Sequence, residues 1–181
     1  MRARLIIAAT PAFAFLLQCA GAAVLDADEQ PDAGRAYLFG RFHHRVAEHG
    51  GKLGLALRNA NTGTEYIIVF QGKNGIAAVP ARAGTYKITE VVYLTGLGRE
   101  KGRRLFLPPS PFRYMSGLFT APAGVPTYLG DFGASTLTRG KNHIWRFHSI
   151  NDRFEKTRAE MEADYPLLRS LSPPRRAFRK P

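Results

Sequence analysis

The stretch that most constrains the fold is residues 79–94, VPARAGTYKITEVVYL. It contains a turn at Ala83-Gly84, and apolar residues then recur at every second position, with Glu90 as the one exception. Successive side chains of a β-strand point to opposite faces, so this alternation predicts a tight turn followed by a long strand with one buried face. The residues expected on the buried face are Tyr86, Ile88, Val92 and Leu94.

Shorter strands are expected on both sides of this stretch. Lys52–Asn59 has a leucine at every second position, which is typical of a sheet with one buried face. Asn61-Thr62-Gly63 and Asn74-Gly75 are each expected to form a hairpin turn, because glycine accepts a positive φ. The other expected strands are Arg35–Val46, Glu65–Gln71, Ile76–Val79, Leu105–Leu107, Phe112–Ala121, Thr127–Phe132 and Lys141–Ile150.

Glu65–Gln71 is apolar on both faces, so it is expected at a central position. The residues expected to share a face are Tyr37 with Phe39, Leu38 with Phe42, and Tyr128 with Phe132. Turn signals recur every eight to twelve residues without an alternation of strands and helices, and this spacing indicates a β-sandwich.

Helical spacing occurs once, near the C-terminus. Asp152 and Glu155 stand as at a helix start, and Pro166 stands at its end. The helix is expected to pack an apolar stripe on the edge of the sandwich. That stripe consists of Phe154, Met161 and Tyr165. The last residues, SPPRRAFRKP, combine prolines with basic residues, which predicts a disordered tail.

The composition fits a single globular domain, with 181 residues of which 45% are hydrophobic and 22% charged. The expected fold is mainly β: an antiparallel β-sandwich over residues 35–150, one C-terminal helix over 151–168 packed on it, and a disordered basic tail over 169–181. The polar, acidic segment 23–34 is expected to be a linker.

Residues 1–22 have the pattern of a signal peptide. Arg2 and Arg4 precede an uncharged apolar run, LIIAATPAFAFLL, and small residues follow it. The run is shorter than the roughly 20 residues that a membrane-spanning helix needs. We therefore expect export from the cytoplasm and a periplasmic or outer-membrane-anchored location.

Cys19, the only cysteine, follows the apolar run after one residue, Gln18. Leu16-Leu17-Gln18-Cys19 resembles the lipobox of bacterial lipoproteins, which implies lipid attachment at Cys19, although Gln18 departs from the small residue of that motif. The alternative is ordinary cleavage after the A-x-A sequence Ala20-Gly21-Ala22, which would remove Cys19. The sequence leaves both alternatives open.

Three segments carry a wider resemblance: AYLFGRF at 36–42, VPARAGTYKI at 79–88 and FTAPAGVPTYLGDF at 119–132. Together they resemble bacterial cell-envelope lipoproteins and secreted proteins of unassigned function that have a transthyretin-like, or carboxypeptidase-regulatory-like, β-sandwich. Ala83 stands where that pattern has proline. The resemblance implies an immunoglobulin- or transthyretin-like fold and an envelope location, and it implies no reaction.

Histidines are the most plausible metal ligands in the chain. His43 and His143 are expected on neighbouring strands, where they could approach each other with His44. However, the five histidines, which also include His49 and His148, show no compact metal-binding spacing. We therefore expect structural or surface histidines, no metal site and no cofactor.

No catalytic residue is indicated. The Gly-x-Ser-x-Gly motif of serine hydrolases is absent, and Gly96-Leu97-Gly98 lacks the context of a phosphate-binding loop. Glu90 and Asp131 could form a buried pair, but nothing identifies a catalytic dyad. The expected function is a non-enzymatic binding or structural module of the envelope. The alternative is an exported metal-binding protein or hydrolase that uses His43, His44 and His143.

The net charge of +12 favours an anionic partner. The basic loop 99–104 and Arg113 could contact lipid phosphates. Export argues against nucleic acid, so the expected partner is another envelope protein or an anionic membrane surface, with a possible lipid anchor. The oligomeric state is left open.

Overall fold

The described part of the chain is mainly β. The computed structural model describes residues 20–21, 25–44, 52–69, 75–95, 98–100, 117–139 and 142–178, with the backbone alone at 20–21, 43–44, 52–53, 90–95, 98–100, 134–139 and 142–150. These residues form two sheets and one α-helix, which confirms the coarse prediction of a mainly β chain with a C-terminal helix. The leader and Cys19 lie outside them.

The first sheet has the strand order β1-β4-β3-β6-β7, and β8 also pairs with β6. β3 and β4 form the hairpin predicted at Asn61-Thr62-Gly63, where Gly63 has φ +70°. The strands are β1 (Ala20–Gly21), β3 (Lys52–Asn59), β4 (Glu65–Val69), β6 (Gly84–Thr95), β7 (Gly98–Glu100) and β8 (Leu118–Ala121).

The second sheet has the order β10-β9-β2-β5, with β11 paired to β9. Its central pair, β2 and β9, runs parallel, so the prediction of wholly antiparallel sheets is wrong. The turn signals that predict hairpins say nothing about how β2 pairs with a strand so far along the chain. The strands are β2 (Arg35–His44), β5 (Ile76–Arg82), β9 (Pro126–Arg139), β10 (Asn142–Asn151) and β11 (Arg175–Arg176).

The stretch 79–94 crosses from one sheet to the other at Ala83. Val79 to Arg82 belongs to β5 in the second sheet, whereas Gly84 begins β6 in the first. β4 and β5 likewise lie in different sheets. The prediction of a hairpin at Asn74-Gly75 is therefore wrong, although Gly75 does have φ +74°.

A β-bulge in β6 explains why Glu90 breaks the alternation. Leu57 of β3 pairs with Ile88, but the residue before it, Ala56, pairs with Glu90. Thr89 is therefore the extra residue in β6. The Thr89 hydroxyl donates a hydrogen bond to the Ala56 carbonyl, 3.2 Å away. A bulge shifts the alternation by one residue. The pairing beyond it places Val91, not Val92, opposite the core residue Leu55.

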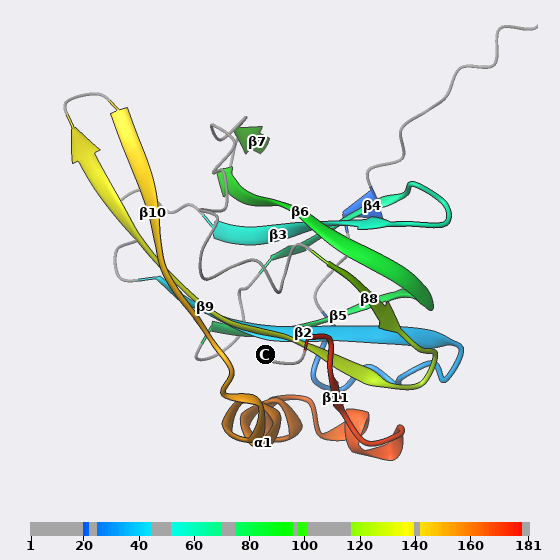
Figure 1. The fold of residues 1–181 in the computed structure, drawn as a ribbon. Helices are drawn as coiled ribbons and strands as arrows, with labels where there is room; N and C mark the ends of the chain where they lie inside the picture. The colour runs from blue at the N-terminus through cyan, green and yellow to red at the C-terminus, as the bar shows by residue number, and fades with distance from the viewer. Residues whose placement is uncertain are drawn as a thin grey trace, which may run out of the picture.

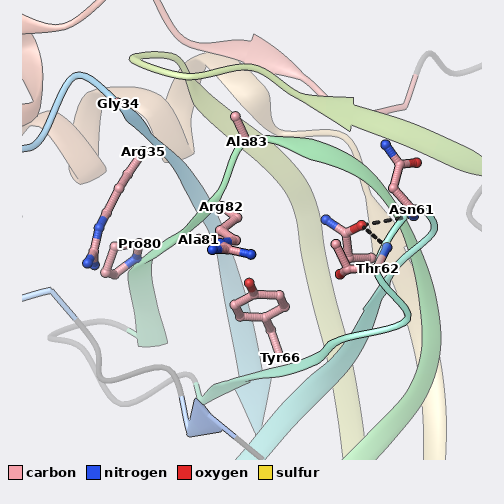
Figure 2. Close-up of a pocket in the computed structure, with 10 residues that line it drawn as sticks. Gly34, Arg35, Asn61, Thr62, Tyr66, Pro80, Ala81, Arg82 and Ala83 are labelled. Atoms are coloured by element: carbon pink, nitrogen blue, oxygen red, sulfur yellow. Dashed lines mark hydrogen bonds between the residues drawn. The ribbon is translucent and has the colours of Figure 1, made fainter. Parts of the chain in front are cut away.

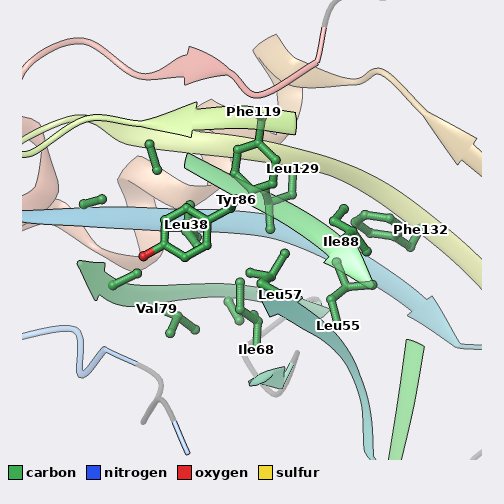
Figure 3. Packing of buried hydrophobic residues seen from close by; sticks show 14 of the residues in the cluster. Leu38, Leu55, Leu57, Ile68, Val79, Tyr86, Ile88, Phe119, Leu129 and Phe132 are labelled. Carbon is green, nitrogen blue, oxygen red and sulfur yellow. The ribbon is translucent and has the colours of Figure 1, made fainter. Parts of the chain in front are cut away.

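The inter-sheet core fills the space between the two sheets (Figure 3). Tyr86 and Ile88 of β6 are buried in it, as predicted. Tyr86 stacks on Phe119 with ring centroids 5.9 Å apart, and Phe42 stacks on Phe132 at 6.0 Å. None of the described residues in this core carries a charge.

A third layer lies on the outer face of the second sheet, below it in Figure 1. It consists of α1 (Phe154–Asp164) and the 3-10 helix η3 (Pro166–Ser170). The predicted stripe is buried here, but it covers the face of the sheet and not the edge of the sandwich. We use the name helix layer for the apolar residues that are buried between these helices and the second sheet: Leu25, Tyr37, Phe39, Ile76, Ala78, Tyr128, Phe154, Met161, Tyr165 and Leu168.

β2 separates the two cores as its alternation predicts. Leu38 and Phe42 enter the inter-sheet core, and Tyr37 and Phe39 enter the helix layer. In β9 the corresponding prediction is wrong, because Tyr128 lies in the helix layer and Phe132 in the inter-sheet core. The register against β2 shifts between these two residues, next to Gly130, which has φ +135°.

Two segments expected to lie outside the fold contribute to it. In the predicted linker, Leu25 is buried in the helix layer, and its N–H donates to the Ala78 carbonyl at 2.9 Å. In the predicted disordered tail, Arg175 and Arg176 pair with β9, and Phe178 packs edge-on against Phe119 at 5.2 Å. Apolar residues in both segments find partners that a composition-based prediction does not consider.

Candidate functional site

A pocket of about 660 Å³ opens at one end of the sandwich (Figure 2). Three parts of the chain build it: the start of β2, the end of β5 with the turn at Ala83, and the β3–β4 hairpin. Its volume falls within the range of small-molecule sites. The lining residues are Gly34, Arg35, Asn59, Asn61, Thr62, Tyr66, Pro80, Ala81, Arg82 and Ala83.

Arg35 and Arg82 are directly opposite each other in the antiparallel pair of β2 and β5. Residues opposite each other on neighbouring strands lie on the same side of the sheet, with Cβ atoms about 5 Å apart. Register therefore brings together two cations that are 47 residues apart in sequence. Arg35 has a carboxylate neighbour, because its Nε lies 3.6 Å from Oδ2 of Asp32.

The hairpin wall of the pocket is held in shape by Asn59. Its Oδ1 accepts hydrogen bonds from the N–H groups of Asn61 at 2.9 Å and Thr62 at 3.0 Å (Figure 2). The neighbouring residue Gly84 leaves room for this side chain, since a Cβ there would stand 2.8 Å from Nδ2 of Asn59. This local need explains a glycine at the start of β6.

One tyrosine of the pocket wall rests on a second tyrosine in the core. Tyr66 lines the pocket, and its ring meets that of Tyr86 edge-on at 5.8 Å. The Tyr86 hydroxyl donates to the Arg82 carbonyl at 2.5 Å, which ties the end of β5 to the start of β6. Burial raises the pKa of Tyr86 above its ordinary value, and the hydrogen bond with the Asn59 side chain partly counters that rise.

A second polar group lies under α1, and all of its members except Glu160, whose side chain is 30% exposed, are buried. Asp131 of β9 accepts hydrogen bonds at Oδ1 from the hydroxyls of Tyr128 at 2.9 Å and Thr157 at 2.7 Å. Arg41 of β2 pairs in register with Asp131, and its guanidinium forms an ion pair with Glu160 of α1. We call these five residues the buried charge cluster.

The buried charge cluster is suited to holding α1 on the sheet rather than to binding a ligand. Asp131 is 1% exposed and Arg41 4%, so a ligand could reach them only if α1 moved away. Burial raises the pKa of Tyr128 far above its ordinary value, so this hydroxyl stays a donor to Asp131. Oδ2 of Asp131 has no hydrogen-bond partner among the described residues.

The histidines are not arranged as expected. β9 lies between β2 and β10, so the prediction that His43 and His143 occupy neighbouring strands is wrong. His43 pairs with Gly133, and His143 pairs with Thr138, five positions further along β9. His148, at the β10 bulge, is the histidine level with His43. Within the described residues, no three His, Cys, Asp or Glu residues are placed to hold a metal ion.

The other predicted site residues are also separated or lie beyond the description. Glu90 belongs to the first sheet, whereas Asp131 belongs to the second and is directed toward α1 on its outer face. Asp131 bonds to Tyr128 and Thr157 instead. The residues outside the described chain are Cys19, His49, residues 101–104 of the basic loop, and Arg113.

Sequence reasoning missed the two arginines of the pocket and Arg41. For Arg41 a signal existed, because it shares the alternation of Tyr37 and Phe39 and so is expected on a buried face. For Arg35 and Arg82 no local signal existed, since their proximity depends on the register between β2 and β5.

Comparison of the chain with protein-family models, with curated proteins and with solved structures gives no match. Within the described residues, no helix combines the length and the apolar character needed to cross a membrane. The function must therefore be argued from the leader, the pocket and the surface of this chain.

Proposed function

We propose that this protein is a non-enzymatic, exported protein of the cell envelope whose sandwich acts as a binding module. One observation carries the binding role: the pocket presents two arginines with amide and hydroxyl groups around an apolar wall. Such groups hold and orient a ligand. The described lining residues include neither a nucleophile beside a base nor a pair of carboxylates. The leader supports export.

For the finer fold, we propose an immunoglobulin- or transthyretin-like sandwich. The AGTY sequence at 83–86, which carries much of the resemblance, makes the sharp passage from β5 to β6. The parallel pair of β2 and β9 and the covering helix layer are additions of this chain to such a sandwich. The proposal thus concerns the two sheets and not the third layer.

The two processing alternatives have different consequences for β1. Its two residues, Ala20 and Gly21, pair in parallel with Tyr66 and Ile67 of β4. Lipid attachment at Cys19 would keep β1 in the mature protein, next to the pocket residue Tyr66. Cleavage after Ala22 would remove β1 and leave that edge of β4 without its described partner.

Fractionation of a bacterial host that expresses the full chain tests export. We expect the wild-type protein in the envelope fraction with a shortened N-terminus by mass spectrometry, and a variant lacking residues 2–17 in the cytoplasm. Cys19→Ala should release the protein from membranes only if Cys19 carries the lipid. A full-length chain that stays in the cytoplasm with its leader intact would contradict the proposal.

The non-enzymatic part needs its own test. The purified mature protein is assayed against ester, peptide, glycoside and phosphate-ester substrates. We expect no turnover above the buffer rate. Turnover that disappears on one substitution of a polar lining residue, such as Tyr66→Phe, with the melting temperature unchanged, would show that the protein is an enzyme.

A further inference from the structure

The pocket has an excess of positive charge. Arg35 and Arg82 are opposite each other across β2 and β5, and like charges in that position repel. Asp32 offsets part of the Arg35 charge at 3.6 Å, but both groups are mostly exposed, so this pair is weak. The Arg82 guanidinium has no carboxylate partner among the described residues. An anion between the two arginines would relieve the repulsion.

The hairpin wall supplies one neutral donor next to the arginines. In Figure 2 the hydroxyl end of Tyr66 points toward the Arg82 side chain, and the Asn61 amide lies at the opposite side of the pocket. The Asn59 contacts hold this wall in place before any ligand arrives. Such preorganisation lowers the entropic cost of binding.

The remaining wall is apolar and includes Pro80, Ala81 and Ala83, and in Figure 2 Pro80 lies between the Arg35 and Arg82 side chains. A bare inorganic anion would leave this wall and most of the 660 Å³ unused. The pocket therefore suits an anionic group that is attached to a small organic body.

We propose that this pocket binds a phosphate-bearing ligand, with Arg35 and Arg82 on the phosphate oxygens and the Tyr66 hydroxyl as an additional donor. This inference rests on the proposed function, because it names the ligand of that binding module. A phosphate presents more oxygens and more charge than one arginine can satisfy, whereas one bidentate arginine suffices for a carboxylate. Two arginines and a tyrosine hydroxyl in one pocket thus favour phosphate.

A soluble phosphate ester and the phosphate headgroup of a membrane lipid share this chemistry. Isothermal titration of the purified mature protein with glycerol 3-phosphate tests the first source. Co-sedimentation with phosphatidylcholine vesicles that contain or lack phosphatidic acid tests the second. Glutarate, a dicarboxylate, serves as the competing anion in both assays.

Three charge variants make the assay specific. Arg82→Gln should weaken binding of the phosphate probe about tenfold or more, the equivalent of one charge-assisted hydrogen bond. Arg35→Gln should weaken it less, because Asp32 already offsets that charge. Arg169→Gln, which removes the same charge from exposed η3, should change binding less than about twofold, since Arg169 does not line the pocket and exposed charges are screened.

Each outcome decides the inference. Binding of glycerol 3-phosphate, or of vesicles with phosphatidic acid, that Arg82→Gln reduces and Arg169→Gln preserves supports it and identifies the source. No binding of either phosphate probe, equal binding of glutarate, or equal loss in Arg169→Gln overturns it. If the probe binds but is hydrolysed, or the chain is not exported, the proposed function fails while the phosphate site stands.

Discussion

The two sides of the second sheet bury residues of different kinds. Toward the first sheet, the inter-sheet core contains no charged residue among those described. Toward α1, the helix layer adjoins Arg41 and Asp131, the only charged residues described as buried. The same two strands, β2 and β9, supply residues to both sides.

The difference shows that the two sides are held by different forces. Two sheets satisfy their backbone groups within their own ladders, so apolar contact between side chains is enough to join them. A single helix on a sheet can slide or rotate at little cost in apolar area. A buried charge with specific partners on α1 disfavours such shifts, and we expect the buried charge cluster to fix the helix position.

The largest effect is expected from removing the cation of the buried charge cluster. Arg41→Met leaves the Glu160 carboxylate without its ion-pair partner and the buried Asp131 carboxylate without a cation opposite it, which should lower the free energy of unfolding by about 3–5 kcal/mol. Urea unfolding measures the loss. Leu38→Met, three residues away and facing the inter-sheet core, is the control and should cost less than about 1.5 kcal/mol. Equal losses would remove the distinction between the two sides.

A cavity in the inter-sheet core should have a comparable or slightly smaller effect. Leu38 is completely buried, so Leu38→Ala should cost about 2–5 kcal/mol. Amide hydrogen exchange separates it from Arg41→Met. We expect faster exchange throughout β3 and β6 in Leu38→Ala, and faster exchange first in α1 in Arg41→Met. The same exchange pattern in both variants would count against separate layers.

Alkaline pH should loosen the helix layer first. Burial raises the pKa of three tyrosines in the helix layer, Tyr37, Tyr128 and Tyr165. In the inter-sheet core it raises the pKa of one tyrosine, Tyr86. Above pH about 10, tyrosine ionises in the unfolded chain and stays protonated in the folded one. The unfolded chain then binds fewer protons, so the free energy of unfolding falls as pH rises.

The measurement is stability against pH from 8 to 12, followed by tyrosinate absorbance. Tyr128→Phe should flatten the alkaline decline, although it also loses its hydrogen bond to Asp131, which costs about 1–3 kcal/mol at neutral pH. Stability that stays constant up to pH 12 would contradict the burial of these hydroxyls.

The smallest effect is expected where the C-terminal segment covers α1. Arg176 lies over the Phe154 ring at 4.2 Å and pairs with Asp152 at 3.2 Å, but all its charged contacts are partly exposed. Arg176→Ala should therefore cost less than about 1 kcal/mol, and added salt should reduce the difference further. A thermal shift assay is sufficient. A loss as large as that of Arg41→Met would mean that the tail, not the buried charge cluster, holds the helix layer.

Much of the secondary structure could be predicted from the sequence, because it depends on local pattern. β3 begins and ends where its alternating leucines predict, and the stripe of Phe154, Met161 and Tyr165 is buried. The prediction that ran past the shift beside Gly130 was wrong, because Tyr128 and Phe132 lie on different sides of the sheet. The extra residue at Thr89 likewise shifts the backbone pairing of the following part of β6 by one position.

The candidate site was harder to predict than the strands. Its residues come from segments that are distant in the chain, and no motif joins Arg35, Tyr66 and Arg82. The histidine hypothesis depended on adjacency of β2 and β10, which the interposed β9 removes. The prediction of a disordered tail rested on composition, and composition does not show that Phe178 contacts the aromatic residue Phe119 of β8.

By itself, the sequence determined the positions of most turns, the apolar faces of the strands and the amphipathic helix, since these follow from the period of a strand or helix and from glycine. Only the tertiary structure decided which sheet each strand joins, that β2 and β9 run parallel, and which charges meet. Arg41 reaches Glu160, and Arg35 stands beside Arg82, because of pairing between segments far apart in the chain. Local periodicity carries no information about such pairing.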